Sequence, residues 1–190
     1  MLYSQRPVES NKFVFPIDLD GTEKTIYLQL DTEGTLQLPA KLVSEKDYHQ
    51  REFSFYLMEG MLAGVIGIML FYNLSLWYVF RTHEYLYYVL YGISVLTVQF
   101  TMLGLSFQYI WPSATWWNNA VVPASMLSTV VFMLLFTNVF LNVRAHRPNL
   151  SNIILFCCVV LSLSSLASFF MAYELTIKIA MLSVLLCLTL

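Results

Sequence analysis

Few side chains in the apolar part of this sequence could do chemistry. One carboxylate, Glu59, and three amides, Asn73, Gln99 and Asn138, interrupt long apolar runs. A carboxylate inside a membrane is costly and often functional, but near the end of a span it can instead extend to the interface. We expect Glu59 to extend to the outer interface, and the amides to make hydrogen bonds across helices rather than to line a pathway.

The sequence contains no recognisable catalytic or metal-binding spacing. It has no His-Glu-x-x-His, phosphate-binding glycine loop, Cys-x-x-Cys or nucleophile elbow. His83 and His146 fall in predicted loops without a partner at metal-ligand or triad spacing. Cys157, Cys158 and Cys187 lie within apolar runs, as small hydrophobic residues do. We therefore predict no enzymatic activity, no metal and no cofactor for this chain.

The composition indicates a membrane protein with a polar N-terminal segment. Hydrophobic residues make up 58% of the 190 residues and charged residues 12%, whereas soluble domains carry about 25% charged residues. Residues 1–54 hold six basic and nine acidic side chains, but residues 55–190 hold only four and three. This distribution excludes the basic surface that a nucleic acid needs and predicts a polytopic helical domain over residues 55–190.

Five apolar runs predict transmembrane helices, because about 20 apolar residues are enough to cross the hydrocarbon core. The predicted helices cover about residues 55–80, 85–105, 120–141, 153–172 and 177–190. The last run is still apolar at Leu190, so we expect the helical bundle to continue beyond this chain.

The polar N-terminal segment has the alternating pattern of β structure. The predicted strands cover residues 24–30 and 35–38, with a further one at 12–15. Because three short strands cannot bury a core alone, we interpret residues 1–43 as the C-terminal edge of a larger β domain. Residues 44–54 form a polar stalk, in which the spacing of Asp47 and Arg51 favours a helix.

The basic residues predict the orientation of the helices. Arg81, Arg144 and Arg147 lie in two loops on one side, and the loop at 106–119 on the other side has no Lys or Arg. Positive charge marks the cytoplasmic side. We therefore expect residues 1–54 and the loop at 106–119 on the outer side, and the loops at 81–84 and 142–152 on the cytoplasmic side.

A ridge of small residues lies on the first predicted helix. Gly60, Gly64 and Gly67 recur at helical spacing, and small residues let two helices approach closely in lipid. We expect this ridge to pack against a neighbouring helix or to form a homodimer contact. Leu70 is expected to face outward from that contact.

Short motifs also occur in an order that resembles a known family. The β segment contains Thr25-Ile-Tyr-Leu-Gln-Leu30 and Leu36-Gln-Leu-Pro39. The helical region contains Leu70-Phe-Tyr-Asn-Leu74, Arg81, Glu84-Tyr-Leu-Tyr-Tyr88, Gly104 and Tyr109-Ile-Trp-Pro112. Over most of residues 24–150 this order resembles the bacterial seven-transmembrane receptors with diverse intracellular signalling modules, the DISM family.

The resemblance implies an extracellular jelly-roll domain similar to carbohydrate-binding modules, seven helices, and a cytoplasmic histidine kinase, diguanylate cyclase or similar output. The chain would then be a fragment of a sensory receptor of the bacterial inner (plasma) membrane, with residues 1–43 as the C-terminal part of its extracellular β-sandwich sensor domain. Its partners would be the lipid bilayer and an unidentified extracellular small molecule, for which a carbohydrate is one candidate. Two other classes stay open on the residues alone, namely a transporter or channel component and a membrane anchor for a downstream enzyme.

Overall fold

The described part of the chain, in a computed structural model, is a bundle of antiparallel helices. The structure describes residues 7–8, 10–18, 25, 27, 40–112, 114–170 and 173–187. The longer helices are α1 (Glu45–Phe80), α2 (His83–Met102), α4 (Thr115–Phe140), α6 (Pro148–Ala167) and α7 (Tyr173–Cys187). Two short helices, α3 (Leu105–Tyr109) and α5 (Val143–His146), lie between them. Helices α1, α2, α4 and α6 are long and apolar enough to cross a membrane, which confirms the predicted helical membrane bundle.

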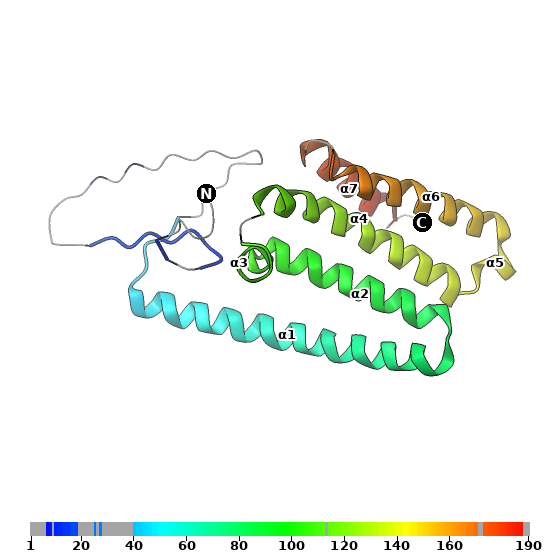
Figure 1. Ribbon diagram of the computed structural model, residues 1–190, viewed down its shortest axis with the longest axis horizontal. Coiled ribbons are helices and arrows are strands. Elements are labelled where there is room, and N and C mark those ends of the chain that lie inside the picture. Colours follow the sequence, from blue (N-terminus) through cyan, green and yellow to red (C-terminus); the bar gives the residue numbers. More distant parts are fainter. Residues whose placement is uncertain are drawn as a thin grey trace.

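Helix α4 is the centre of the bundle and α1 is its edge (Figure 1). Helix α4 contacts α2, α6 and α7, while the main helix contact of α1 is with α2. The tightest apolar cluster joins α4 to α6 and consists of Val130, Val131, Leu134, Ile154 and Cys158. No residue of α1 is buried, so most of its surface faces away from the described helices.

Helix α1 is 36 residues long and continues without a break from the stalk into the first apolar span. Its N-terminus is capped by Ser44, whose Oγ accepts a hydrogen bond from the Asp47 backbone N–H at 3.2 Å. The predicted Asp47–Arg51 pair does not form among the described residues. Instead the carboxylate of Glu45 lies 3.9 Å from the imidazole of His49. The stalk is therefore helical, but its cap rather than that ion pair begins the helix.

The helix ends differ from the predicted ones where the backbone has a specific signal. Helix α2 stops at Met102 because Gly104 adopts a left-handed conformation with φ of 76°. Helix α6 begins at Pro148, inside the predicted loop, because proline has no N–H to leave unpaired in a first turn.

The predicted β segment is largely outside the described residues. The strands predicted at 24–30 and 35–38 fall on residues that the structure does not describe, apart from Thr25 and Tyr27. Residues 12–15 are described and form no strand, which corrects the prediction of a strand there. A strand requires a neighbour that pairs with its backbone, and no described segment pairs with residues 12–15.

Candidate functional site at the N-terminal end of the bundle

The N-terminal segment touches the turn between α2 and α3. The Asn11 side-chain Nδ2 donates a hydrogen bond to the Leu103 carbonyl oxygen at 2.9 Å. At the next residue, Gly104, a Cβ would lie only 3.1 Å from the Asn11 carbonyl oxygen. Glycine is thus favoured at 104 both by its positive φ and by the close approach of Asn11.

The same segment also touches the first turns of α1. The Ser10 hydroxyl donates a hydrogen bond to Glu52 Oε1 at 3.0 Å, and the Tyr48 hydroxyl donates to the same oxygen at 2.8 Å. The Lys12 ammonium lies 4.8 Å from the centre of the Phe55 ring, within the range of a cation–π interaction. We call residues 10–12, with their contacts on α1 and on the α2–α3 turn, the junction.

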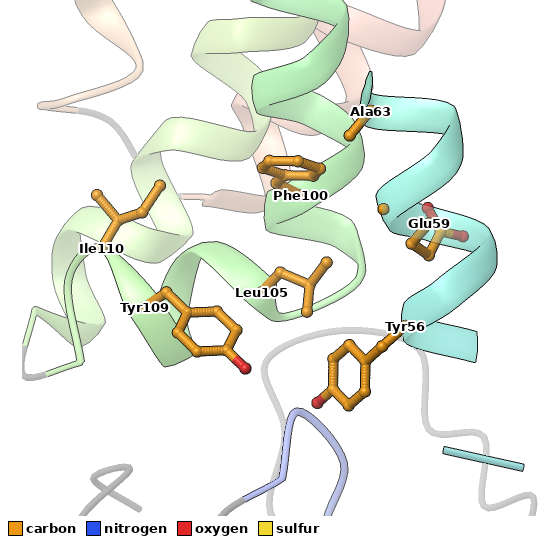
Figure 2. Close-up of a pocket in the computed structure, with 8 residues that line it drawn as sticks. Tyr56, Glu59, Ala63, Phe100, Leu105, Tyr109 and Ile110 are labelled. Carbon is orange, nitrogen blue, oxygen red and sulfur yellow. The ribbon is translucent and has the colours of Figure 1, made fainter. Parts of the chain in front are cut away.

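Further along α1 from the junction, two hydrogen bonds join α1 to α3 and to α2. The Tyr56 hydroxyl donates to Gln108 Oε1 of α3 at 3.2 Å, and Gln99 Nε2 of α2 donates to Glu59 Oε2 at 2.8 Å. Glu59 therefore has a partner on a neighbouring helix, and Gln99 makes the expected hydrogen bond across helices. The extension of Glu59 to the outer interface stays a prediction. These contacts border a pocket of about 250 Å³ (Figure 2). Its lining residues are Tyr56, Glu59, Gly60, Ala63, Phe100, Leu105, Tyr109 and Ile110.

The two other amides lie apart from this pocket. Asn73 Nδ2 donates to the Met69 carbonyl oxygen of its own helix at 2.8 Å. Asn138 Oδ1 and Ser151 Oγ are buried without a hydrogen-bond partner among the described residues. The four polar side chains therefore do not converge on one cavity, as a substrate pathway would require.

The glycine ridge of α1 meets no other helix in the described bundle. A Cβ added to Gly60, Gly64 or Gly67 would have no described atom within 4 Å. Close packing of these three glycines against another described helix is therefore not observed, although Gly60 lines the pocket beside α2 and α3. A contact of the ridge with another molecule stays a prediction.

A different glycine makes the close contact between α1 and α2. A Cβ at Gly92 would collide with Cδ2 of Leu70. The prediction that Leu70 faces outward is therefore wrong. Its side chain packs against α2 because Gly92 leaves room for it.

Three arginines lie at the end of the bundle opposite the junction. Arg81 ends α1, and α5 carries Arg144 and is followed by Arg147. Figure 1 shows the α1–α2 turn and α5 at the same end. Arg81 has φ of 57°, and its guanidinium carbon lies 5.0 Å from the centre of the Tyr78 ring. The structure thus groups the three arginines used to predict the orientation.

The two histidines predicted to lie in loops are instead at helix ends, because His83 is the first residue of α2 and His146 is the last residue of α5. Both have local partners. The His83 ring stacks on Tyr87, and His146 Nδ1 lies 3.2 Å from the Asn142 carbonyl oxygen. The described residues contain no group of three His, Cys, Asp or Glu side chains that could hold a metal ion.

Comparison with known protein families gives two matches that together cover most of the chain. Residues 55–190 match the family model described as 7TM diverse intracellular signalling. Residues 1–44 match the model described as 7TMR-DISM extracellular 2. No curated protein and no solved structure matches the chain. The two matched segments are separated by residues 45–54, which form the first part of α1 beside the junction.

Proposed function

Because the chain belongs to the 7TM diverse intracellular signalling family, we propose that it couples a ligand bound outside the membrane to a cytoplasmic output. The matched models describe an extracellular region and a seven-transmembrane region of a receptor. The proposal adds that residues 10–12 pass the signal from the first region to the second. The output domain itself would lie outside this chain.

The observation that carries the proposal is the hydrogen bond from Asn11 to Leu103. It joins residues 92 positions apart and connects the segment matched by the extracellular model directly to the end of α2. A ligand can shift a two-state equilibrium only through contacts that differ between the states. Displacement of residues 10–12 would change the contacts at Leu103 and Gly104, and through them the position of α2 relative to α1.

The location and the partners are part of the same proposal. We propose that the junction lies outside the bacterial inner membrane, which the arginines at the opposite end support because basic loops stay in the cytoplasm. The extracellular ligand would be a small molecule, with a carbohydrate as one candidate by family resemblance. A homodimer would use the side of α1 that exposes Gly64, where an added Cβ would meet no described atom within 4 Å.

The test asks whether the junction controls the far end of the bundle. Spin labels would be placed at Thr82→Cys and Ala145→Cys, in a chain without its native cysteines and reconstituted in nanodiscs. Both positions are exposed at the basic end. We expect Asn11→Ala, which removes the hydrogen bond to Leu103, to change the distance distribution between the labels.

The matched control is Lys41→Ala, which changes an exposed residue just before the stalk. It should leave the label distances unchanged. If the distance between the two labels has the same distribution in the Asn11→Ala variant and in the chain that keeps Asn11, coupling through residues 10–12 is contradicted.

A further inference from the structure

The pocket between α1, α2 and α3 has an almost entirely apolar surface. Glu59 is one of its lining residues, but the Glu59 carboxylate accepts the hydrogen bond from Gln99 and adds almost no polar surface to the pocket. The volume of about 250 Å³ lies below the range of about 300–1,000 Å³ that is typical of pockets for drug-sized ligands. The pocket therefore suits one part of a larger apolar molecule.

Small residues on α1 leave room for this pocket. Gly60 and Ala63 line it from α1, and neither has a side chain long enough to fill the space. A Cβ added to Gly60 would have no described atom within 4 Å. Side chains that border an apolar hollow lack packing partners on that side, so a hydrocarbon group placed there gains dispersion contacts. Such a group should therefore stabilise the packing of the three helices.

The pocket has a polar end and an apolar end. Figure 2 shows the rings of Tyr56 and Tyr109 at one end, with their hydroxyl groups turned toward one another, and Ala63 and Phe100 at the other. Ala63 follows Tyr56 on α1 by about two turns, or about 10 Å along the helix. Tyrosines are enriched where the hydrocarbon core meets the polar interface. The pocket thus extends from a tyrosine-marked end along a helix that is long and apolar enough to span a membrane.

The pocket is accessible from the lipid side of the bundle. Its lining residues Tyr109 and Ile110 are 70% and 62% exposed, whereas Leu105 is only 9% exposed. Helix α1, which forms another wall, lies at the edge of the bundle (Figure 1). The apolar molecules that surround a membrane-spanning helix are phospholipids, whose acyl chains form the hydrocarbon core. An acyl chain that starts at the interface can therefore reach the pocket along α1.

We propose that this pocket binds one acyl chain of a bilayer phospholipid. Tyr56 and Tyr109 lie at its interfacial end, and Gly60, Ala63 and Phe100 contact the hydrocarbon chain further along α1. The site is separate from the extracellular ligand of the proposed receptor. The bound chain would contact α1, α2 and α3 together and would stabilise their packing beside the junction.

The test uses phosphatidylethanolamine that carries a photoreactive diazirine on one acyl chain. The full chain is reconstituted with this lipid in nanodiscs and irradiated, and the labelled residues are identified by mass spectrometry. Leu105 is the reporter, because a side chain that is 9% exposed has little contact with lipid outside the pocket. Met61 and Ile68 are exposed on α1 and serve as reference positions that any surrounding lipid labels. We expect label on Leu105 as well as on the reference positions.

The variants assign the label to the pocket. Gly60→Leu fills the pocket from α1, and we expect it to lose the label on Leu105 while the reference label stays. The matched control is Gly64→Leu, the same change one turn further along α1, at a residue that does not line this pocket. A Cβ at Gly64 also meets no described atom within 4 Å, so this variant should keep the label. Ala63→Leu fills the pocket from a neighbouring position and replaces Gly60→Leu if that variant does not fold.

The midpoint of thermal unfolding in maltoside micelles gives a second measurement. A ligand that binds only the folded state raises this midpoint as its concentration increases. We expect added phosphatidylethanolamine to raise the midpoint of the unaltered chain and of Gly64→Leu, and to raise that of Gly60→Leu less.

Three results would overturn the proposal. The first is no label on Leu105 in the unaltered chain. The second is equal label on Leu105, or an equal rise of the midpoint, in Gly60→Leu, Ala63→Leu and Gly64→Leu. The third is label on Leu105 only after the chain is diluted to monomers, which would show that a second copy of the chain covers the pocket.

Discussion

At the residue scale, Gly92 and Gly64 show how the same residue type has different consequences on two neighbouring helices. Leu70 of α1 occupies the space beside Gly92 on α2, so any side chain at 92 must displace it. Gly64 faces no described atom within 4 Å. Both glycines lie inside helices, so replacing either with alanine changes the helix propensity in the same direction.

The first prediction compares these two glycines. We expect Gly92→Ala to lower the thermal stability of the chain in detergent relative to Gly64→Ala, because overpacking of a close contact costs about 1–3 kcal/mol. Unfolding followed by circular dichroism would measure the difference. Equal midpoints for the two variants would contradict the Leu70–Gly92 contact.

The second prediction concerns two serines of α6. The hydroxyl of Ser165 donates to the Ala124 carbonyl oxygen of α4 at 3.1 Å, whereas the hydroxyl of Ser151 is buried without a described partner. Ser165→Ala should therefore lower stability by about 0.6 kcal/mol, a typical value for an interhelical hydrogen bond in a membrane protein. Ser151→Ala should be neutral or stabilising, because it removes a buried group that is not satisfied. A larger loss of unfolding free energy for Ser151→Ala would contradict this assignment.

At the element scale, α1 acts as a single rigid connection from the stalk to the basic end. It has no break between Glu45 and Phe80, and its polar contacts to the rest of the described chain are concentrated near the junction, through Glu52, Tyr56 and Glu59. A continuous helix fixes the relative rotation of its two ends, whereas a Gly/Ser segment does not. Signals could therefore enter both through the stalk and through the contact of Asn11 with the α2–α3 turn.

The third prediction tests the stalk as a rigid element. Replacing residues 45–52 with a Gly/Ser sequence should preserve membrane insertion but broaden the distances between labels at Thr82→Cys and Ala145→Cys. Insertion of one helical residue after Arg51 should shift them, because each residue rotates the helix by about 100°. Asp47→Ala with Arg51→Ala should have little effect, since these two side chains do not pair. Unchanged distances in the Gly/Ser variant would show that the stalk does not need to be helical.

The sequence predicts which segments are helical, but it does not predict which sides of the helices pack together. The apolar runs predict the long helices because a span needs a minimum number of apolar residues. They do not predict which side of α1 packs, because exposed residues such as Met61, Ile68 and Phe71 are as apolar as those that face α2. The sequence alone therefore places Leu70 on the wrong side of the helix. The structure shows that Leu70 packs against α2 because Gly92 leaves space there. The sequence around Gly92 contains no motif that would indicate this contact.

At the scale of the whole molecule, the two ends of the bundle differ in the residues that they carry. The junction end carries the contacts of residues 10–12, and the other end carries Arg81, Arg144 and Arg147. The arginines are recognisable in the sequence because the positive-inside rule needs only loop composition. The junction is not recognisable in this way, because Asn11 and Leu103 meet only after the bundle has formed.

The fourth prediction is the orientation of the whole chain. In a background without Cys157, Cys158 and Cys187, a membrane-impermeant maleimide added to intact cells should label Lys41→Cys but not Ala145→Cys. Both positions are exposed in the structure. Permeabilised cells should give labelling at both and serve as the control. Labelling of Ala145→Cys alone in intact cells would reverse the proposed orientation.

The position of α1 at the edge of the bundle also has a mechanical consequence. Because α1 is attached mainly to α2 and buries none of its residues, a force applied at Ser44 and directed away from the membrane acts on one helix contact at a time. The chain should therefore yield in steps, and the first step should extract α1 while α2, α4 and α6 stay together. In single-molecule pulling, the first rupture would then release about 36 residues, at up to about 3.6 Å of extended chain for each residue.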